Sequence, residues 1–295
     1  SSASFLMRIA YRFFLIESEG NVVHSYRSRS LILLVSSVVA WVLILFGLVL
    51  ESLIAFYVFQ SVISNLFLRK KMPIQYSLRN RLDQNKYYNE LAVLKRGMSL
   101  SYLAGYLSYN AVVPIVFAML SNKLAGQLGF SLALFSSVTL LSSSFVSAKN
   151  HTFATKIASG AIIELNSLFI RQMIFAILAS VFLLIAIFVF ILLMSMLGFP
   201  LEERLLPLDL CLLIGLSAIA SSIIYAQALY VRAHKVEPFV KISISVGFIS
   251  IGLIFLGSLF GISWVVFMYT SSIIFISLPL TTLVFLEFYR KNSHA

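Results

Sequence analysis

The organisation of the chain is decided by residues 69–96, RKKMPIQYSLRNRLDQNKYYNELAVLKR. Eight of these residues are basic and only two, Asp83 and Glu90, are acidic. The segment is the one long polar interruption in a sequence that otherwise runs from one apolar stretch to the next. It therefore separates a short N-terminal part, residues 1–68, from a long C-terminal part, residues 97–287, which is followed by a tail, residues 288–295.

Composition indicates the class of protein. The chain has 295 residues, of which 60% are hydrophobic and 11% are charged. A soluble domain is typically about half apolar and about one quarter charged. Because so few charged side chains cannot cover a surface in contact with water, the sequence predicts an all-α integral membrane protein. Helices are expected because lipid cannot satisfy backbone polar groups, and no stretch alternates as the strands of a membrane barrel do.

The apolar stretches predict eight complete transmembrane helices, each able to cross a hydrocarbon core of about 30 Å. They cover residues 31–50, 52–68, 98–120, 126–148, 172–197, 208–230, 240–260 and 263–286. A further apolar segment, residues 5–16, has only about half the length of a span and contains Arg8 and Arg12. We expect it to be the last part of a helix whose beginning is missing from this chain; a re-entrant or interfacial helix is the alternative.

The basic residues predict how these spans are oriented. If residues 69–96 are cytoplasmic, then so are residues 17–30, 149–171, 231–241 and the C-terminus. With the N-terminal segment they hold 20 of the 22 lysines and arginines, since only Lys123 and Arg204 fall on the opposite side. This is the positive-inside pattern of membrane proteins. We therefore assign the net charge of +11 to orientation and to anionic phospholipids, and not to nucleic acid.

The sequence does not predict an enzyme. It contains no Walker A loop, no G-x-S-x-G elbow and no paired-acid motif of a glycosyltransferase. Its single cysteine, Cys211, lies inside an apolar stretch, so neither a disulfide nor a cysteine-based metal site is expected. We expect no catalytic residue, no cofactor and no bound metal.

Polar residues in the span at 98–120 are the first candidates for a substrate cavity. Tyr102, Tyr106 and Tyr109 follow one another at helical spacing on one face, with Asn110 beside them. Polar groups at membrane depth require partners or a hydrated cavity. On another face, small residues recur at helical spacing, a pattern that lets a second helix approach closely. These small residues are Gly97, Ser101, Gly105 and Ser108.

The next span begins Gly126-Gln127-Leu128-Gly129, and Gln127 is a further cavity candidate. One face of this span carries Ser136, Thr139, Ser143 and Ser147. Two interpretations are open. The hydroxyl groups form a hydrated groove for a polar cargo, or the face packs against another helix and the serines bond back to their own helical turn.

Three segments carry a family resemblance. They are KRGMSLSYLAGYLSYNAVVPIVFAML (95–120), SNKLAGQLGFSLALFSSVTLLSSSFVSAKNHTFATKIASGAIIELNSLFIRQ (121–172) and IESEGNVVHSYRSRS (16–30). They resemble membrane proteins of bacterial polysaccharide biosynthesis, distant relatives of the O-antigen and oligosaccharide-lipid flippases in the multidrug/oligosaccharidyl-lipid/polysaccharide exporter superfamily. The likeness rests on patterns of small and polar residues, not on catalytic signatures.

The resemblance implies two six-helix bundles joined by a cytoplasmic linker. Residues 97–287 would be the complete second bundle, residues 69–96 the linker, and residues 1–68 the end of the fourth helix with the fifth and sixth. The first bundle would thus be incomplete. The implied location is the bacterial cytoplasmic (inner) membrane, with the C-terminus in the cytoplasm.

The implied function is translocation of a lipid-linked oligosaccharide of the undecaprenyl-pyrophosphate type by alternating access, as in lipopolysaccharide O-antigen export. Arg8 and Arg12 would then be candidates to contact the anionic cargo, although both can instead reach the headgroups. Two alternatives remain: a multidrug or cation antiporter of the same fold, and a non-transporting scaffold that binds other polysaccharide assembly proteins.

Overall fold

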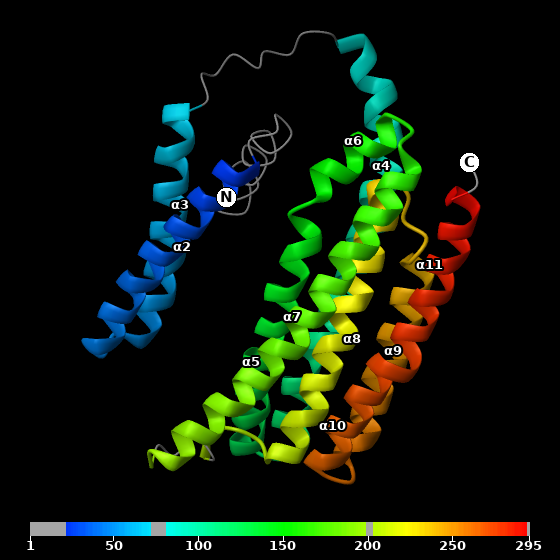
Figure 1. The fold of residues 1–295 in the computed structure, drawn as a ribbon. Coiled ribbons are helices and arrows are strands. Elements are labelled where there is room, and N and C mark those ends of the chain that lie inside the picture. Colours follow the sequence, from blue (N-terminus) through cyan, green and yellow to red (C-terminus); the bar gives the residue numbers. More distant parts are fainter. Residues whose placement is uncertain (1–21, 72–80, 199–202, 294–295) are drawn as a thin grey trace. The chain divides into compact units, whose positions relative to one another are not determined.

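The structure is a computed structural model that describes residues 22–71, 81–198 and 203–293. The regular structure in these ranges is helical (Figure 1), so the predicted all-α class is confirmed. The helices are α2 (Val22–Leu45), α3 (Val49–Lys71), α4 (Arg81–Met119), α5 (Asn122–Ser147), α6 (Asn150–Ala158), α7 (Ile162–Met196), α8 (Leu208–Ala233), α9 (Val240–Ser258), α10 (Ile262–Ser271) and α11 (Leu278–Ser293), with a π-helix, η2 (Ser272–Ser277), before α11.

Eight segments within the described ranges are helical, long and apolar enough to cross a membrane. They are Arg27–Leu45, Val49–Leu66, Leu94–Met119, Asn122–Ala158, Ile162–Met196, Leu208–Ala233, Val240–Ser258 and Ile262–Asn292. Each overlaps one span predicted from the apolar stretches, so the eight predicted spans are helical and are compatible with a multi-pass membrane protein. The predicted partial helix with Arg8 and Arg12 lies outside the described residues.

Two helices begin before the membrane spans that the sequence predicts. Helix α5 begins at Asn122, ahead of the predicted span at 126–148, because the Ser121 hydroxyl caps that helix and accepts a hydrogen bond from the Leu124 amide at 3.3 Å. Helix α7 begins at Ile162, ahead of the predicted span at 172–197, so its polar first turns continue directly into the apolar span. In both cases the helix starts earlier than hydropathy alone indicates.

The polar segment at 69–96 is largely helical where it is described. Helix α3 continues through Lys71, and α4 begins at Arg81 and runs for 39 residues, about 58 Å at 1.5 Å per residue. Residues 81–96 are rich in Leu, Lys, Arg, Gln, Glu and Ala and contain neither Gly nor Pro. Such residues favour a helix. The second half of this segment is therefore an extension of a membrane helix and not a loop.

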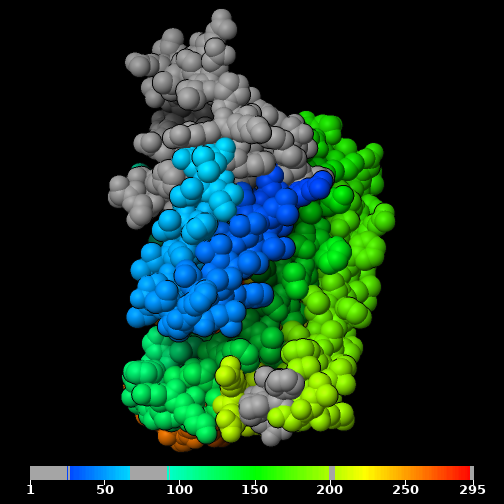
Figure 2. All heavy atoms as spheres, turned by 90° about the vertical axis from the view of Figure 1, so that its left-hand side faces the viewer, coloured from blue at the N-terminus to red at the C-terminus, as the bar shows by residue number. Residues whose placement is uncertain are grey.

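The chain divides into two compact units, residues 1–85 and 86–295. In the first, α2 and α3 pack against each other as a hairpin whose turn contains Gly47 at a φ of +81°. These two helices (blue to light blue in Figure 2) expose large apolar side chains, including Trp41, Leu45 and Leu50. A surface of this kind suits contact with lipid tails.

The second unit is built around α8, which packs against α5, α6, α7, α10 and α11. Polar bonds join α8 to α5: the Thr139 hydroxyl donates to the carbonyl of Ala218 at 3.0 Å, and the hydroxyls of Ser142 and Ser222 lie 2.8 Å apart. Such bonds help hold helices together in lipid, where burial of apolar surface supplies little. Phe169 of α7 also packs against Tyr230 of α8, with ring centroids 4.6 Å apart.

The last predicted span, residues 263–286, is not a regular α-helix. Residues Ser272–Ser277 form a π-helix, and the amide of Leu278 donates to the carbonyl of Ile273, five residues back. Pro279 follows directly. It has no amide hydrogen for the carbonyl of Phe275, and its ring crowds that turn, so the wider winding just before it relieves the conflict.

Candidate functional site

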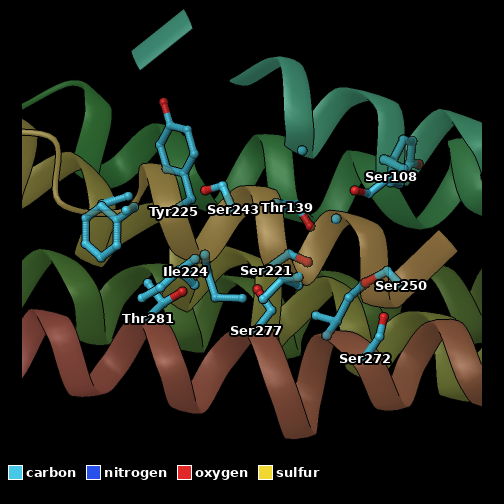
Figure 3. A pocket seen from close by; sticks show the side chains of 18 of the residues that line it. Ser108, Thr139, Ser221, Ile224, Tyr225, Ser243, Ser250, Ser272, Ser277 and Thr281 are labelled. Atoms are coloured by element: carbon cyan, nitrogen blue, oxygen red, sulfur yellow. The ribbon is translucent and has the colours of Figure 1, made fainter. Parts of the chain in front are cut away.

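A cavity of about 380 Å³ lies in the second unit between α4, α8, α9 and the α10–η2–α11 segment (Figure 3). Hydroxyl groups are its main polar feature. The wall carries Ser108, Ser221, Ser243, Ser250, Ser272 and Ser277, with Thr139 of α5 and Thr281 of α11. The cavity is therefore a mostly apolar pocket with several hydroxyl groups in its wall, which is the usual form of a site for a specific ligand.

A second cavity of about 420 Å³ adjoins the first on the side of α5. The two share five lining residues: Tyr109, Thr139, Ser221, Tyr225 and Tyr269. The rings of Tyr109 and Tyr269 meet edge to face at this boundary, with centroids 6.4 Å apart. The cavities thus form one two-chambered site whose dividing wall is rich in tyrosine.

Several cavity hydroxyls act as donors to the backbone of their own helix. Ser108 donates to the carbonyl of Ala104 at 2.7 Å, Ser221 to that of Ser217 at 2.8 Å, and Ser272 to that of Tyr269 at 2.7 Å. A hydroxyl that donates its hydrogen retains two acceptor lone pairs. These three groups therefore retain acceptor lone pairs for a hydrogen-bond donor.

The π-helix places two of the serines. Ser272 and Ser277 are its first and last residues, and both line the cavity. They are five residues apart, which is the spacing of the π-helical hydrogen bond, so the wider turn brings them to the same side of the segment. The irregular winding near Pro279 thus contributes directly to the wall of the site.

A charged cluster lies where α8 ends. The side chain of Arg232, which also lines the cavity, pairs with Glu237: Nε lies 2.5 Å from Oε2, and Nη2 lies 3.2 Å from Oε1. The two side chains are only 15% and 2% exposed. Helix α4 completes the cluster, because Ser101 donates to Glu237 at 3.0 Å and the Arg232 guanidinium lies 4.6 Å from the centroid of the Tyr102 ring.

The backbone after α8 explains why Arg232 and Glu237 meet. Lys235 adopts a φ of +61°, and its amide donates to the carbonyl of Arg232 at 2.9 Å, which ends the helix with a tight reversal. The left-handed conformation is unfavourable for a lysine by about 1–2 kcal/mol. The reversal carries Glu237 back beside the last turn of α8.

The predicted seam of small residues does allow close approach of another helix. Carbon atoms of Glu237 and Val240 lie 3.4 Å from the position that a Cβ on Gly97 would occupy. On α9, a Cβ on Gly247 would lie 2.8 Å from the hydroxyl of Ser108. Helices α4 and α9 are therefore in near contact where the seam predicts a partner.

An apolar groove of about 230 Å³ lies beside the cavity, between α4 and α9. It shares Ser108 and Gly247 with the cavity wall. The remaining lining is apolar and comprises Leu100, Leu103, Ala104, Leu107, Ile244, Phe248 and Ile251. The hydroxyl-bearing cavity and a more apolar groove thus meet at the contact of these two helices.

Of the candidates predicted on the span at 98–120, some lie at the cavities or the charged cluster and others do not. Tyr109 lines both cavities, and its hydroxyl donates to the carbonyl of Leu132 at 3.2 Å. Tyr102 contacts Arg232. Tyr106 is 64% exposed, and Asn110 donates to its carbonyl at 2.8 Å. Neither Tyr106 nor Asn110 is part of the described lining of the two cavities.

The other predicted candidates do not join this site. Gln127 lies near the start of α5, where its side-chain amide donates to the carbonyl of Glu203 at 3.1 Å. That bond fastens the segment before α8 to α5, which is a structural role. Arg8 and Arg12 lie outside the described residues.

The polar face of α5 has features of both interpretations. Ser136, Ser143 and Ser147 each donate to a carbonyl three residues back, as the packing interpretation predicts. Yet Ser136, Thr139 and Ser143 also line the second cavity, as the groove interpretation predicts. Back-bonding and cavity lining are thus compatible, because a hydroxyl can do both.

Sequence reasoning missed the charged cluster. Arg232 was counted among the basic flanks of a predicted cytoplasmic segment, residues 231–241. The available signal was an arginine at the end of an apolar stretch with an acid five residues later, immediately before Pro238. Tyr225 and Tyr269 were also missed, because single tyrosines within apolar stretches are common.

Comparison with known proteins adds no relative. No protein-family model matches the chain, and no match was found among curated proteins or solved structures.

Proposed function

We propose that this protein is a transporter of bacterial cell-surface polysaccharide biosynthesis that moves a lipid-linked oligosaccharide across the cytoplasmic membrane. The observation that carries the proposal is the two-chambered, hydroxyl-lined cavity inside a unit of membrane-spanning helices. Hydroxyl groups at membrane depth match a cargo that brings many hydroxyls of its own, because each can donate or accept.

The apolar groove between α4 and α9 supports an amphiphilic cargo. A protein that binds a lipid-linked sugar must hold the sugar among polar groups while the hydrocarbon tail stays in apolar surroundings. The groove and the cavity meet at Ser108 and Gly247, so one molecule can occupy both at the same time. Translocation follows if the cavity opens to one side of the membrane at a time, as in other transporters built of helical repeats.

A cation antiporter is the second candidate, because Glu237 is a buried acid beside the cavity. Such a transporter uses an acid that exchanges its proton or cation with the cargo. Here the carboxylate is already neutralised by Arg232, and Arg232, not Glu237, is part of the described cavity wall. This arrangement favours an anionic cargo over a cationic one.

Translocation can be measured with the purified protein in sealed vesicles. Fluorescent undecaprenyl-pyrophosphate-linked sugar is added to one leaflet, and a membrane-impermeant quencher reports its arrival in the other. We expect protein-containing vesicles to equilibrate the lipid faster than protein-free ones. Equal rates would remove the proposed function. A fluorescent phospholipid serves as the control cargo and should not be accelerated to the same extent.

A further inference from the structure

The pairing of Arg232 and Glu237 has the geometry of a ligand contact. The guanidinium uses Nε and Nη2 towards the two oxygens of one carboxylate, which is the bidentate arrangement that arginine also makes with phosphate. Its third described bond, from Nη1 to the Tyr102 hydroxyl at 3.2 Å, and the nearby ring hold the guanidinium in place independently of Glu237.

We propose that Arg232 is a phosphate-binding residue of the cavity and that Glu237 occupies its binding face until an anionic ligand displaces it. The chemical class of the ligand is a phosphate or diphosphate. Its identification with the headgroup of a lipid-linked sugar rests on the proposed function, whereas the binding of phosphate by Arg232 does not. A neutral ligand cannot replace Glu237, because it would leave the mostly buried guanidinium without a counter-charge.

Displacement of Glu237 also changes a contact between helices. Glu237 accepts a hydrogen bond from Ser101 of α4, so it ties α4 to the turn between α8 and α9. When phosphate takes its place on Arg232, this tie is released. Tyr102, only one residue from Ser101 on α4, keeps its contact with Arg232. Binding of the anion is thereby coupled to the position of the α8–α9 turn against α4.

The proposal predicts that two substitutions change the affinity for phosphate ligands in opposite directions. With the purified full chain in detergent, binding of inorganic pyrophosphate and of undecaprenyl phosphate is measured by titration. Arg232→Gln should weaken binding by a factor on the order of ten or more, because it removes a charge-assisted contact. Glu237→Gln should strengthen it by a factor on the order of ten, because the competing carboxylate charge is gone.

The exposed pair of Glu287 and Lys291 on α11 provides matched controls. Its side chains are 68% and 72% exposed, and neither residue lines the described cavities. Glu287→Gln and Lys291→Gln make the same charge changes and should leave both affinities within about twofold, because exposed pairs contribute little. A general response to net charge would instead move the controls together with the cluster variants.

A purely structural pair gives a different result. If Arg232 and Glu237 only hold the fold, both substitutions weaken binding alike, and that outcome overturns the proposal. The proposal is also overturned if the unaltered protein does not bind undecaprenyl phosphate. Should Glu237→Gln fail to fold, Ser101→Ala loosens Glu237 without a charge change and should still raise affinity by about twofold to fivefold. An unchanged or lower affinity in that variant counts against the displacement.

The two proposals can fail separately. Opposite affinity changes in vesicle-inactive protein would retain the phosphate site and remove the transport function. Active translocation by the protein, together with equally weakened binding in both variants, would retain the transport function and remove the phosphate site. Binding of undecaprenyl phosphate but not of pyrophosphate shows that the site requires the lipid tail; binding of both shows that the phosphate alone suffices. Either pattern supports the site.

Discussion

At the scale of single residues, Gly215 sets how closely α7 and α8 approach. A Cβ at this position would lie only 2.3 Å from the Cδ1 atom of Leu184 and 3.4 Å from the ring of Phe135. Leu184 is itself buried. The absence of a side chain on α8 thus creates the space that the leucine of α7 fills.

We therefore expect Gly215→Ala to destabilise the protein by about 1–3 kcal/mol, because it overpacks this contact. The matched substitution is Gly126→Ala in α5, where a Cβ would meet nothing within 4 Å. It should be neutral or stabilise by up to about 1 kcal/mol, since alanine favours a helix. Unfolding of the purified variants in detergent measures both. Adding Leu184→Ala to Gly215→Ala should cost less than the sum of the two single changes; simple additivity would show that the contact does not matter.

Individual site residues could be predicted only where the sequence carries a local pattern. The spacing of Tyr102, Tyr106 and Tyr109 indicated polar groups at membrane depth, and two of the three lie at the cavity or its charged cluster. The pair of Arg232 and Glu237 depends on the left-handed conformation of Lys235 and on the packing of α4. Neither is visible in residue types or spacing, so composition assigned these charges to a loop.

At the scale of elements, the segment from α10 to α11 combines a membrane span with an irregular turn. Its six π-helical residues contribute Ser272, Ile273 and Ser277 to the cavity. Short π-helical stretches are rare, and they recur at functional sites. Pro279 was visible in the sequence, but a proline within a span predicts a kink as readily as a π-helix. The winding follows from how this turn packs against its neighbours.

Pro279→Ala tests whether this irregular winding serves the site. Alanine can donate to the carbonyl of Phe275, so a regular α-helix becomes favourable and Ser272 and Ser277 no longer face the same side. We expect the free energy of unfolding to rise by up to about 3 kcal/mol, while the rate of translocation of the labelled lipid falls several-fold. Leu283→Ala, at an exposed position on the same helix, is the control and should change neither the free energy of unfolding nor the rate of translocation. An increase in stability with undiminished transport would show that the π-helix is not required.

At the scale of the whole molecule, the sequence was most informative about the number of spans. Lipid forces each long apolar stretch into a helix, so the eight spans follow from hydropathy alone, whereas their ends depend on local groups such as the Ser121 cap. The arrangement of the helices around α8 could not be predicted in this way. It results from glycines, serines and aromatic rings whose partners lie far away in the sequence.

The orientation that we propose places α6 and the C-terminus in the cytoplasm, and α5 supplies a test of it. Cys211 is the only cysteine and is buried, so Cys211→Ser gives a background without reactive thiols. Lys123 and Lys149 are exposed and lie at opposite ends of α5. In that background, Lys123→Cys should react with a membrane-impermeant thiol reagent on intact cells, and Lys149→Cys only after the membrane is permeabilised, because lysines of the cytoplasmic side are retained there.

A third position checks the same arrangement independently. Lys291, exposed in the last turn of α11, lies on the same side as Lys149 if the eight described spans each cross the membrane once. Lys291→Cys should therefore behave as Lys149→Cys does. Labelling of Lys291→Cys on intact cells, with Lys149→Cys still protected, would mean that one segment between them does not cross. The segment containing the π-helix would then be the first candidate for the one that does not cross the membrane, because its winding is irregular. Labelling of both from outside, with Lys123→Cys protected, would invert the whole topology and place the Arg232 cluster on the outer side.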